Sequence, residues 1–155
     1  MVYDIAAHSI AHGGAMTIAQ FDITYPSQDG KMITALVSPP STINADTGLL
    51  LVVHGWSNSR FQYAADMADY AARFNVVCVS PEYRMCGFDH DPVNGKGTTL
   101  PYDYSHLQVI DSLNAIPAAL HHDPCLNQER IMGWGGSQGG HIILLCSAFA
   151  PNSFA

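Results

Sequence analysis

A serine stands among four glycines near the end of the chain, in the sequence G-G-S-Q-G-G at residues 135–140. The motif fits the spacing G-x-S-x-G, with Ser137 between Gly135 and Gly139. A nucleophilic serine on a sharp strand-to-helix turn has strained backbone angles, and side chains at the flanking positions would collide. The pattern therefore predicts acyl transfer through Ser137. The backbone N–H of Gln138, at the start of a helix, would face the developing oxyanion.

Two phosphate-binding motifs also use clustered glycines, and neither fits these residues. A dinucleotide fingerprint needs glycines at i, i+2 and i+5, and counted from Gly133 the last of these positions is Gln138. A P-loop needs Lys and then Ser or Thr after its glycines, whereas His141 and Ile142 follow here. The alternative that stays open is a glycine-rich packing turn with an idle serine.

A second motif, His54-Gly55-Trp56, follows directly after the apolar run at residues 48–53. A His-Gly pair at the end of a buried strand lets the loop turn tightly beside a nucleophile. The backbone N–H of Trp56 is then the second expected oxyanion donor. The alternative is a simple strand-end turn in which His54 caps backbone groups.

Strands and helices that alternate along the chain would position these two motifs. The segment 48–54, which holds five successive aliphatic residues at 49–53, predicts a strand covered on both faces, as in a parallel sheet. Further strands are expected at 17–25, 32–37, 75–80 and 130–134, and helices at 60–74, 102–121 (bent or ended by Pro117) and 139–149. The Asp29-Gly30 turn makes the first two strands a hairpin. The predicted class is α/β: an antiparallel hairpin precedes a mostly parallel sheet with helices on both faces.

Composition excludes several classes of function. Charged residues make up only 12% of the 155, the net charge is −7, and there is no basic run, so neither nucleic acid nor an anionic membrane is an expected partner. The four cysteines form no CxxC pair. His8 and His12 are four apart but have no third ligand nearby, so we expect no metal and no cofactor.

The length predicts a single domain over residues 1–155, with a flexible N-terminal segment at 1–15. That segment has no basic and apolar signal-peptide pattern, and the longest apolar stretch, 142–150, is too short to span a bilayer. A cytoplasmic location is the default expectation.

Taken together, the motifs resemble the α/β-hydrolase superfamily, most closely its prolyl-oligopeptidase, dienelactone-hydrolase and acetyl-esterase branch. The matching features are the hairpin before Pro39-Pro40, L-L-V-V-H-G at 50–55, S-P-E-Y-R at 80–84, Asp111, E-R-I at 129–131 and the glycine motif at 135–140. This resemblance implies a serine hydrolase that acts on a small carboxylic ester or peptide. Gln138 after the serine favours esters, because peptidases of this branch often carry Tyr there.

The sequence departs from the family after Ser137. Family triads continue with an acid and then a His, but residues 138–155 contain no Asp, no Glu and only His141. Neither His90 nor His106 matches a triad position. The resemblance therefore implies strands 1–5 of 8, in a fragment that is inactive alone. The alternative is a non-catalytic binding or assembly module, or a pseudoenzyme remnant. Such a chain would self-associate or bind a partner through an exposed edge strand and its apolar C-terminal helix.

Overall fold

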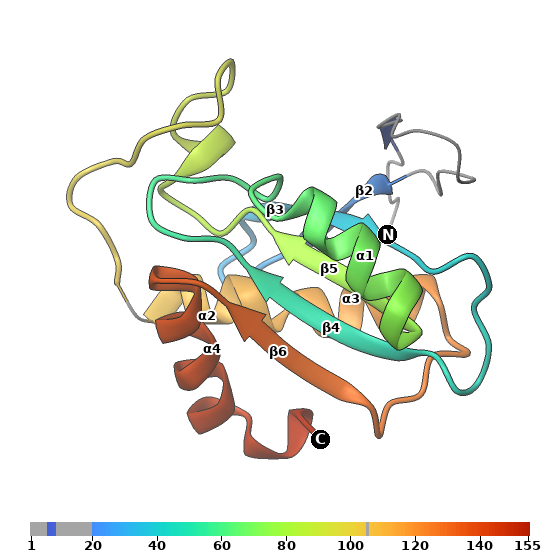
Figure 1. The fold of residues 1–155 in the computed structure, drawn as a ribbon. Helices are drawn as coiled ribbons and strands as arrows, with labels where there is room; N and C mark the ends of the chain where they lie inside the picture. Colours follow the sequence, from blue (N-terminus) through green and yellow to red (C-terminus); the bar gives the residue numbers. More distant parts are fainter. Residues whose placement is uncertain (1–5, 9–19, 105) are drawn as a thin grey trace.

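The structure, a computed structural model, describes residues 6–8, 20–104 and 106–155. Its centre is a six-stranded sheet in the order β1-β2-β3-β5-β4-β6 (Figure 1). The strands are β1 (Ala6–His8), β2 (Gln20–Pro26), β3 (Met32–Ser38), β4 (Gly48–Val53), β5 (Val76–Pro81) and β6 (Ile131–Gly135). The helices are α1 (Ala64–Phe74), α2 (His106–Leu113), α3 (Ala115–His122) and α4 (Gln138–Phe149), with short 3₁₀ turns at Gly87–Asp89 and Pro151–Ser153.

The sheet is mixed rather than mostly parallel. β4 pairs in parallel with β5 and with β6, whereas β1–β2, β2–β3 and β3–β5 are antiparallel. The β2–β3 hairpin turns at Gly30, which has φ +84°, and the N–H of Gly30 donates to Ser27 O at 3.0 Å. Because the hairpin lies beside β5 instead of preceding the sheet, it adds an antiparallel pairing. The α/β class itself is confirmed.

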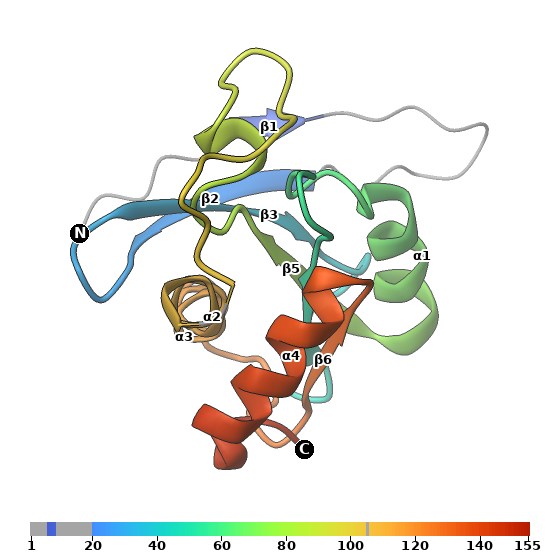
Figure 2. The same cartoon turned by 90° about the vertical axis from the view of Figure 1, so that its left-hand side faces the viewer.

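Helices cover both faces of the sheet, as predicted (Figure 2). α1 lies on one face, and α2, α3 and α4 lie on the other. Successive residues of β4 therefore point into different cores. Leu51 and Val53 belong to the core under α2–α4, whereas Val52 belongs to the core under α1. This double burial explains why the strand is aliphatic throughout.

The helix expected at 102–121 is two helices, and the break is not at Pro117. α2 ends at Leu113, and α3 begins after Asn114. Pro117 is the third residue of α3 and lies within its first turn. Because N–H groups in the first turn have no acceptor within the helix, the proline, which has no N–H, removes no hydrogen bond of α3. The proline therefore favours the start of a new helix, and the interruption lies at Asn114, three residues before it.

The two edge strands of the described sheet, β1 and β6, concern two of the predictions, the flexible N-terminal segment and the exposed edge before Ser137. Within the segment expected to be flexible, residues 6–8 form β1 and pair with β2, while residues 1–5 and 9–15 lie outside the described residues. At the other end, β6 pairs with β4 alone, so the strand that leads to Ser137 is an edge strand as predicted. No helix within the described ranges is long and apolar enough to cross a membrane.

Candidate active site

Ser137 lies on a sharp turn between β6 and α4. Its backbone has φ 55° and ψ −123°, a left-handed conformation that is rare for a residue with a side chain. Such a conformation costs about 1–3 kcal/mol and persists only where the surroundings enforce it. Ser137 is exposed, so the turn holds its hydroxyl out at the carboxyl end of the sheet. These are the features expected of a nucleophile on a strand–turn–helix elbow.

Two glycines make this turn sterically feasible. A Cβ on Gly139 would overlap the carbonyl oxygen of Val53, and one on Gly135 would lie 2.5 Å from the carbonyl carbon of Gly139. Both obstacles are backbone atoms, which cannot rotate away. The predicted spacing therefore reflects the close approach of α4 to the ends of β4 and β6.

We expect Gly139→Ala to destabilise the protein by about 1–3 kcal/mol, as overpacking in a well-packed interior does. The added methyl must push α4 away from Val53. Urea denaturation of both proteins measures the change. Gly140→Ala is the matched control, because the atom nearest to its added Cβ would be Gly135 O, at 3.1 Å. Equal loss of stability in both variants would contradict the close-approach argument.

The two expected oxyanion donors lie on adjacent strand ends. Val53 pairs with Gly135, so the loop after β4 and the turn after β6 leave the sheet side by side. The N–H of Gln138 is at the first position of α4, where helical N–H groups have no intrahelical acceptor. Trp56 follows two residues after His54, and its side chain is 52% exposed. The pairing of these strands thus brings both segments to the carboxyl end of the sheet, as the two motifs predict.

His54 is fully buried and serves the loop rather than the reaction surface. Its Nδ1 lies 2.9 Å from Gly55 O, and because a carbonyl only accepts, Nδ1 carries the proton. Its ring stacks on Tyr83, with centroids 4.0 Å apart. Burial lowers the pKa of His54 to about 4, so the ring is neutral at physiological pH. This arrangement excludes His54 as a base for Ser137.

The buried His54 should make stability depend on pH. The unfolded chain binds a proton at His54 below its ordinary pKa, while the folded chain resists protonation down to about pH 4. The contribution of neutral, buried His54 to the free energy of unfolding is therefore fully present above about pH 6.5. As the pH drops from there towards 4, the free energy of unfolding falls by on the order of 3 kcal/mol. Urea denaturation from pH 7.5 to 4 measures this slope. His54→Asn should flatten it and the exposed His122→Asn should not; an unchanged slope in His54→Asn would contradict the assignment.

Two residues that hold this loop were missed as site residues by the sequence analysis. Tyr83 Oη donates to His54 O at 3.0 Å and to Gly55 O at 3.2 Å. Gln62 Oε1 accepts from the N–H of Gly55 at 2.6 Å. Together they fix both peptide units that precede Trp56. The only sequence signal was the S-P-E-Y-R segment, which contains Tyr83; nothing marked Gln62.

A buried ion-pair cluster anchors the loop that begins at Arg84. The guanidinium of Arg84 donates to the Asp111 carboxylate from Nε and from Nη2, each at 2.8 Å. It also donates from Nη1 to the Asp29 carboxylate at 2.7 Å. Asp111 is fully buried, and Ser27 Oγ also donates to it. Hydrogen bonds from the guanidinium to these carboxylates raise the pKa of Arg84, so the guanidinium stays charged. The cluster therefore joins the hairpin turn, the end of β5 and α2.

Within the described residues, no histidine side chain is hydrogen-bonded to Ser137. The backbone N–H of His141 donates to Ser137 O at 3.2 Å, one helical turn along, while its side chain is exposed. His90 and His106 are exposed on a loop and on α2. Among the residues that the structure describes, no three His, Cys, Asp or Glu side chains form a group able to hold a metal ion. His8 lies in β1, and His12 lies outside the described residues.

Neither the family models nor the curated proteins that were searched match this sequence. Solved structures do match. An acetyl xylan esterase from Paenibacillus sp. R4 superposes with a TM-score of 0.66 and 18% identity, over 95% of this chain and 50% of its own. A carboxyl esterase from Bacillus coagulans gives a TM-score of 0.67 and 19% identity, over 89% of this chain and 43% of its own.

A third structure, an α/β-hydrolase from Penicillium sp. sh18, gives a TM-score of 0.63 and 18% identity, over 85% of this chain and 42% of its own. This chain therefore spans about half the length of these solved structures. Strand order, elbow and superposition agree on one architecture: the chain has the α/β-hydrolase fold, over the N-terminal portion of that fold.

Proposed function

We propose that this chain is the nucleophile-bearing part of a serine hydrolase that cleaves carboxylic esters by acyl transfer. The observation that carries the proposal is the strained, exposed Ser137 on its glycine-flanked elbow. An idle serine would gain nothing from a conformation that costs about 1–3 kcal/mol. The preference for esters over peptides rests on Gln138 after the serine, and two of the similar structures are an acetyl xylan esterase and a carboxyl esterase.

In the proposed reaction, Ser137 Oγ attacks the carbonyl carbon of the ester. The hydroxyl proton passes to a histidine held by an acid, both supplied by polypeptide outside these 155 residues. The N–H groups of Trp56 and Gln138 stabilise the oxyanion, and loss of one such donor costs about 3–4 kcal/mol. The alcohol leaves with the proton, and water then hydrolyses the acyl-serine by the same route.

The rest of the substrate site would also come from outside these residues. A cavity of about 600 Å³ lies between α1 and β6, and Ser137 does not line it. The described residues near Ser137 that could border a substrate are aromatic: Trp56 and Tyr104, both about half exposed, with Tyr102 between their rings. Gln138 Nε2 donates to Tyr104 O at 3.4 Å, which links this group to α4.

A second candidate function is a non-catalytic assembly module, and a specific observation favours it. Among the strands that the structure describes, β6 has β4 as its one neighbour, and Leu144 on α4 is 72% exposed. Both are surfaces that a partner could cover without any chemistry at Ser137.

A fluorophosphonate probe separates the two functions, because it phosphonylates only serines activated by a base. Extract from cells that make the protein is labelled, and peptides are identified by mass spectrometry. We expect label on Ser137 and none on Ser147, an exposed serine within α4. Heat-denatured extract is the control for non-specific labelling. An unlabelled Ser137 in the native protein would contradict the hydrolase proposal and favour the assembly module.

A further inference from the structure

Two loops leave the carboxyl ends of neighbouring strands and are fastened to each other (Figure 1). The β4–α1 loop, residues 54–63, carries Trp56, and the β5–α2 loop, residues 82–104, follows the adjacent strand of the sheet. The N–H of Gly97 in the β5–α2 loop donates to Ser57 O and to Ser57 Oγ, each at 3.1 Å. The β5–α2 loop therefore holds the residue that directly follows Trp56.

Ser57 has a strained backbone that needs such support. Its φ is +64°, in the left-handed region that residues with a side chain rarely adopt. The N–H of Asn58 donates to Gly55 O at 3.2 Å, so Trp56 and Ser57 are the two central residues of a tight turn. A strained turn persists only where surrounding contacts enforce it. If those contacts were lost, the turn would relax and the N–H of Trp56 would change direction.

The carboxylate of Glu82 joins the same two loops at a second point. Its Oε2 accepts from the N–H of Arg60, in the β4–α1 loop, at 2.8 Å. Its Oε1 accepts from the N–H of Phe88, in the β5–α2 loop, at 2.7 Å. Glu82 is only 5% exposed, so water has little access to compete for these donors. One buried carboxylate thus binds a main-chain N–H from each loop.

The surroundings of Glu82 keep its carboxylate in this bridging position. A Cβ on Gly87 would lie 1.8 Å from Glu82 Oε1, so the absence of a side chain there makes the room that the carboxylate fills. Arg60 Nη1 donates to Glu82 Oε2 at 3.3 Å, and the same guanidinium binds both carboxylate oxygens of Asp22. This guanidinium also lies over the ring of Phe88, 5.2 Å from its centroid. The counter-charge of Glu82 therefore contacts both loops as well.

We propose that Glu82 is a positioning residue for the reaction. Its carboxylate couples the β5–α2 loop to the β4–α1 loop and so holds the turn that presents the N–H of Trp56. This role rests on the proposed function, in which the N–H of Trp56 is an oxyanion donor, whereas the coupling of the two loops does not. Glu82 acts through the loops and not on the reacting atoms.

Amide hydrogen exchange in the 155-residue chain, measured by NMR, tests the coupling without any catalysis. In Glu82→Gln, the side-chain oxygen accepts from one of the two N–H groups, and the new NH₂ group faces the other. We expect the amides of Gly97 and Asn58, whose acceptors are in the β4–α1 loop, to exchange at least about 10-fold faster, since a hydrogen bond to a charged group is lost. A purely local role would speed only the amides of Arg60 and Phe88.

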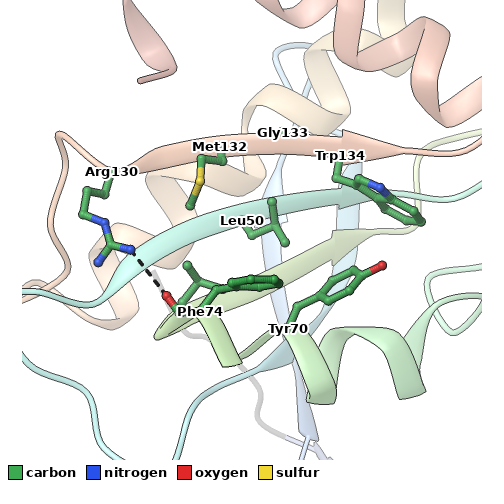
Figure 3. A pocket seen from close by; sticks show the side chains of 8 residues that line it. Leu50, Tyr70, Phe74, Arg130, Met132, Gly133 and Trp134 are labelled. Atoms are coloured by element: carbon green, nitrogen blue, oxygen red, sulfur yellow. Dashed lines mark hydrogen bonds between the residues drawn. The ribbon is translucent and has the colours of Figure 1, made fainter. Parts of the chain in front are cut away.

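Two control variants separate coupling from a general loss of charge or of stability. Glu129→Gln changes the other glutamate of the chain, which is exposed, and should leave the exchange of all these amides unchanged. Met132→Ala removes apolar contacts in the wall of the cavity between α1 and β6 (Figure 3), and none of the residues lining that cavity belongs to either loop. It should lower the Tm without speeding the exchange of Gly97 or Asn58.

Glu82→Asp keeps the experiment decisive if Glu82→Gln does not fold. Aspartate retains the negative charge beside Arg60, but it is one methylene shorter and cannot reach the N–H groups of both loops. We expect the same pattern of faster exchange at Gly97 and Asn58, with a smaller change in Tm than in Glu82→Gln.

Fluorophosphonate labelling of Ser137 in cell extract tests the role in the reaction. The oxygen on phosphorus would occupy the oxyanion site, so a displaced N–H of Trp56 slows the labelling. Loss of a whole oxyanion donor lowers rates by about 10²–10³, and we expect Glu82→Gln to be labelled at least about 10-fold more slowly than the wild-type protein. Glu129→Gln should be labelled at the wild-type rate.

Two results would overturn the inference. If Gly97 and Asn58 exchange at wild-type rates in both Glu82 variants, the carboxylate does not couple the loops. If their exchange is faster but Ser137 is labelled at the wild-type rate, the coupling does not serve the reaction. An unlabelled Ser137 in the wild-type protein would instead contradict the hydrolase proposal, and the exchange rates would still decide whether Glu82 couples the loops.

Discussion

Asp111→Ala should destabilise the protein by about 3–5 kcal/mol, the largest stability effect that we expect from one side chain. The substitution removes the carboxylate that binds Arg84 through two nitrogens, and it leaves a guanidinium that is 5% exposed with only Asp29 as counter-charge. An uncompensated buried charge costs far more than the intact pair contributes. Urea denaturation at pH 7 measures the loss.

Asp69→Ala is the control for Asp111→Ala. Asp69 also pairs with an arginine, Arg73, at 3.0 Å, but both side chains are more than half exposed. Exposed pairs of this i,i+4 kind contribute about 0.3–0.5 kcal/mol. If the two variants lose similar stability, burial does not determine the cost and the anchoring role of Asp111 is wrong.

Residues 1–155 alone should show negligible esterase activity, and this is the largest kinetic effect that we expect. Without a base, serine hydrolases lose on the order of 10⁶ in kcat. Ser137 is exposed on a well-formed elbow, but His54 is fully buried, and the residues after Ser137 include no Asp or Glu and only His141. Hydrolysis of p-nitrophenyl acetate by the wild-type and Ser137→Ala proteins should therefore be equally slow.

Turnover at ordinary esterase rates that Ser137→Ala abolishes would contradict this expectation. It would mean that a histidine within the 155 residues reaches Ser137. His141→Asn, His90→Asn and His106→Asn would then identify it, since loss of the base removes activity and loss of an exposed bystander does not. Slow hydrolysis shared by the wild-type protein and Ser137→Ala would instead come from other surface groups.

The sequence predicted those parts of the fold whose cause is local. Five aliphatic residues in a row at 49–53 cannot form an amphipathic surface element, so a doubly covered strand follows directly. The elbow was also predictable, because the steric need for glycine two positions either side of Ser137 is a property of the turn itself. The structure shows that the segments after β4 and β6 leave the sheet side by side, whereas the oxyanion role of their N–H groups stays a prediction.

Features that depend on contacts between distant segments were not predictable in the same way. Apolar periodicity continues through Asn114, so nothing in the sequence separates α2 from α3. The stacking of Tyr83 on His54 joins residues 29 positions apart, and a tyrosine at the end of a strand carries no mark of that contact. The hairpin position beside β5 likewise depends on the completed sheet, which is why its antiparallel pairing was missed.

The positions of the chain's two tryptophans give each surface its own optical reporter. Trp56 is half exposed in the loop that follows β4, next to the elbow. Trp134 packs edge-on against Tyr63 and lines the cavity between α1 and β6. In a Trp56→Phe protein, all indole emission would come from Trp134 in the cavity between α1 and β6. The wavelength of this emission would follow the entry or loss of water in that cavity. In a Trp134→Phe protein, the emission would instead follow the surroundings of Ser137. Two single-tryptophan variants thus allow folding of the sheet edge and occupancy of the elbow to be followed independently, in real time and without an attached dye.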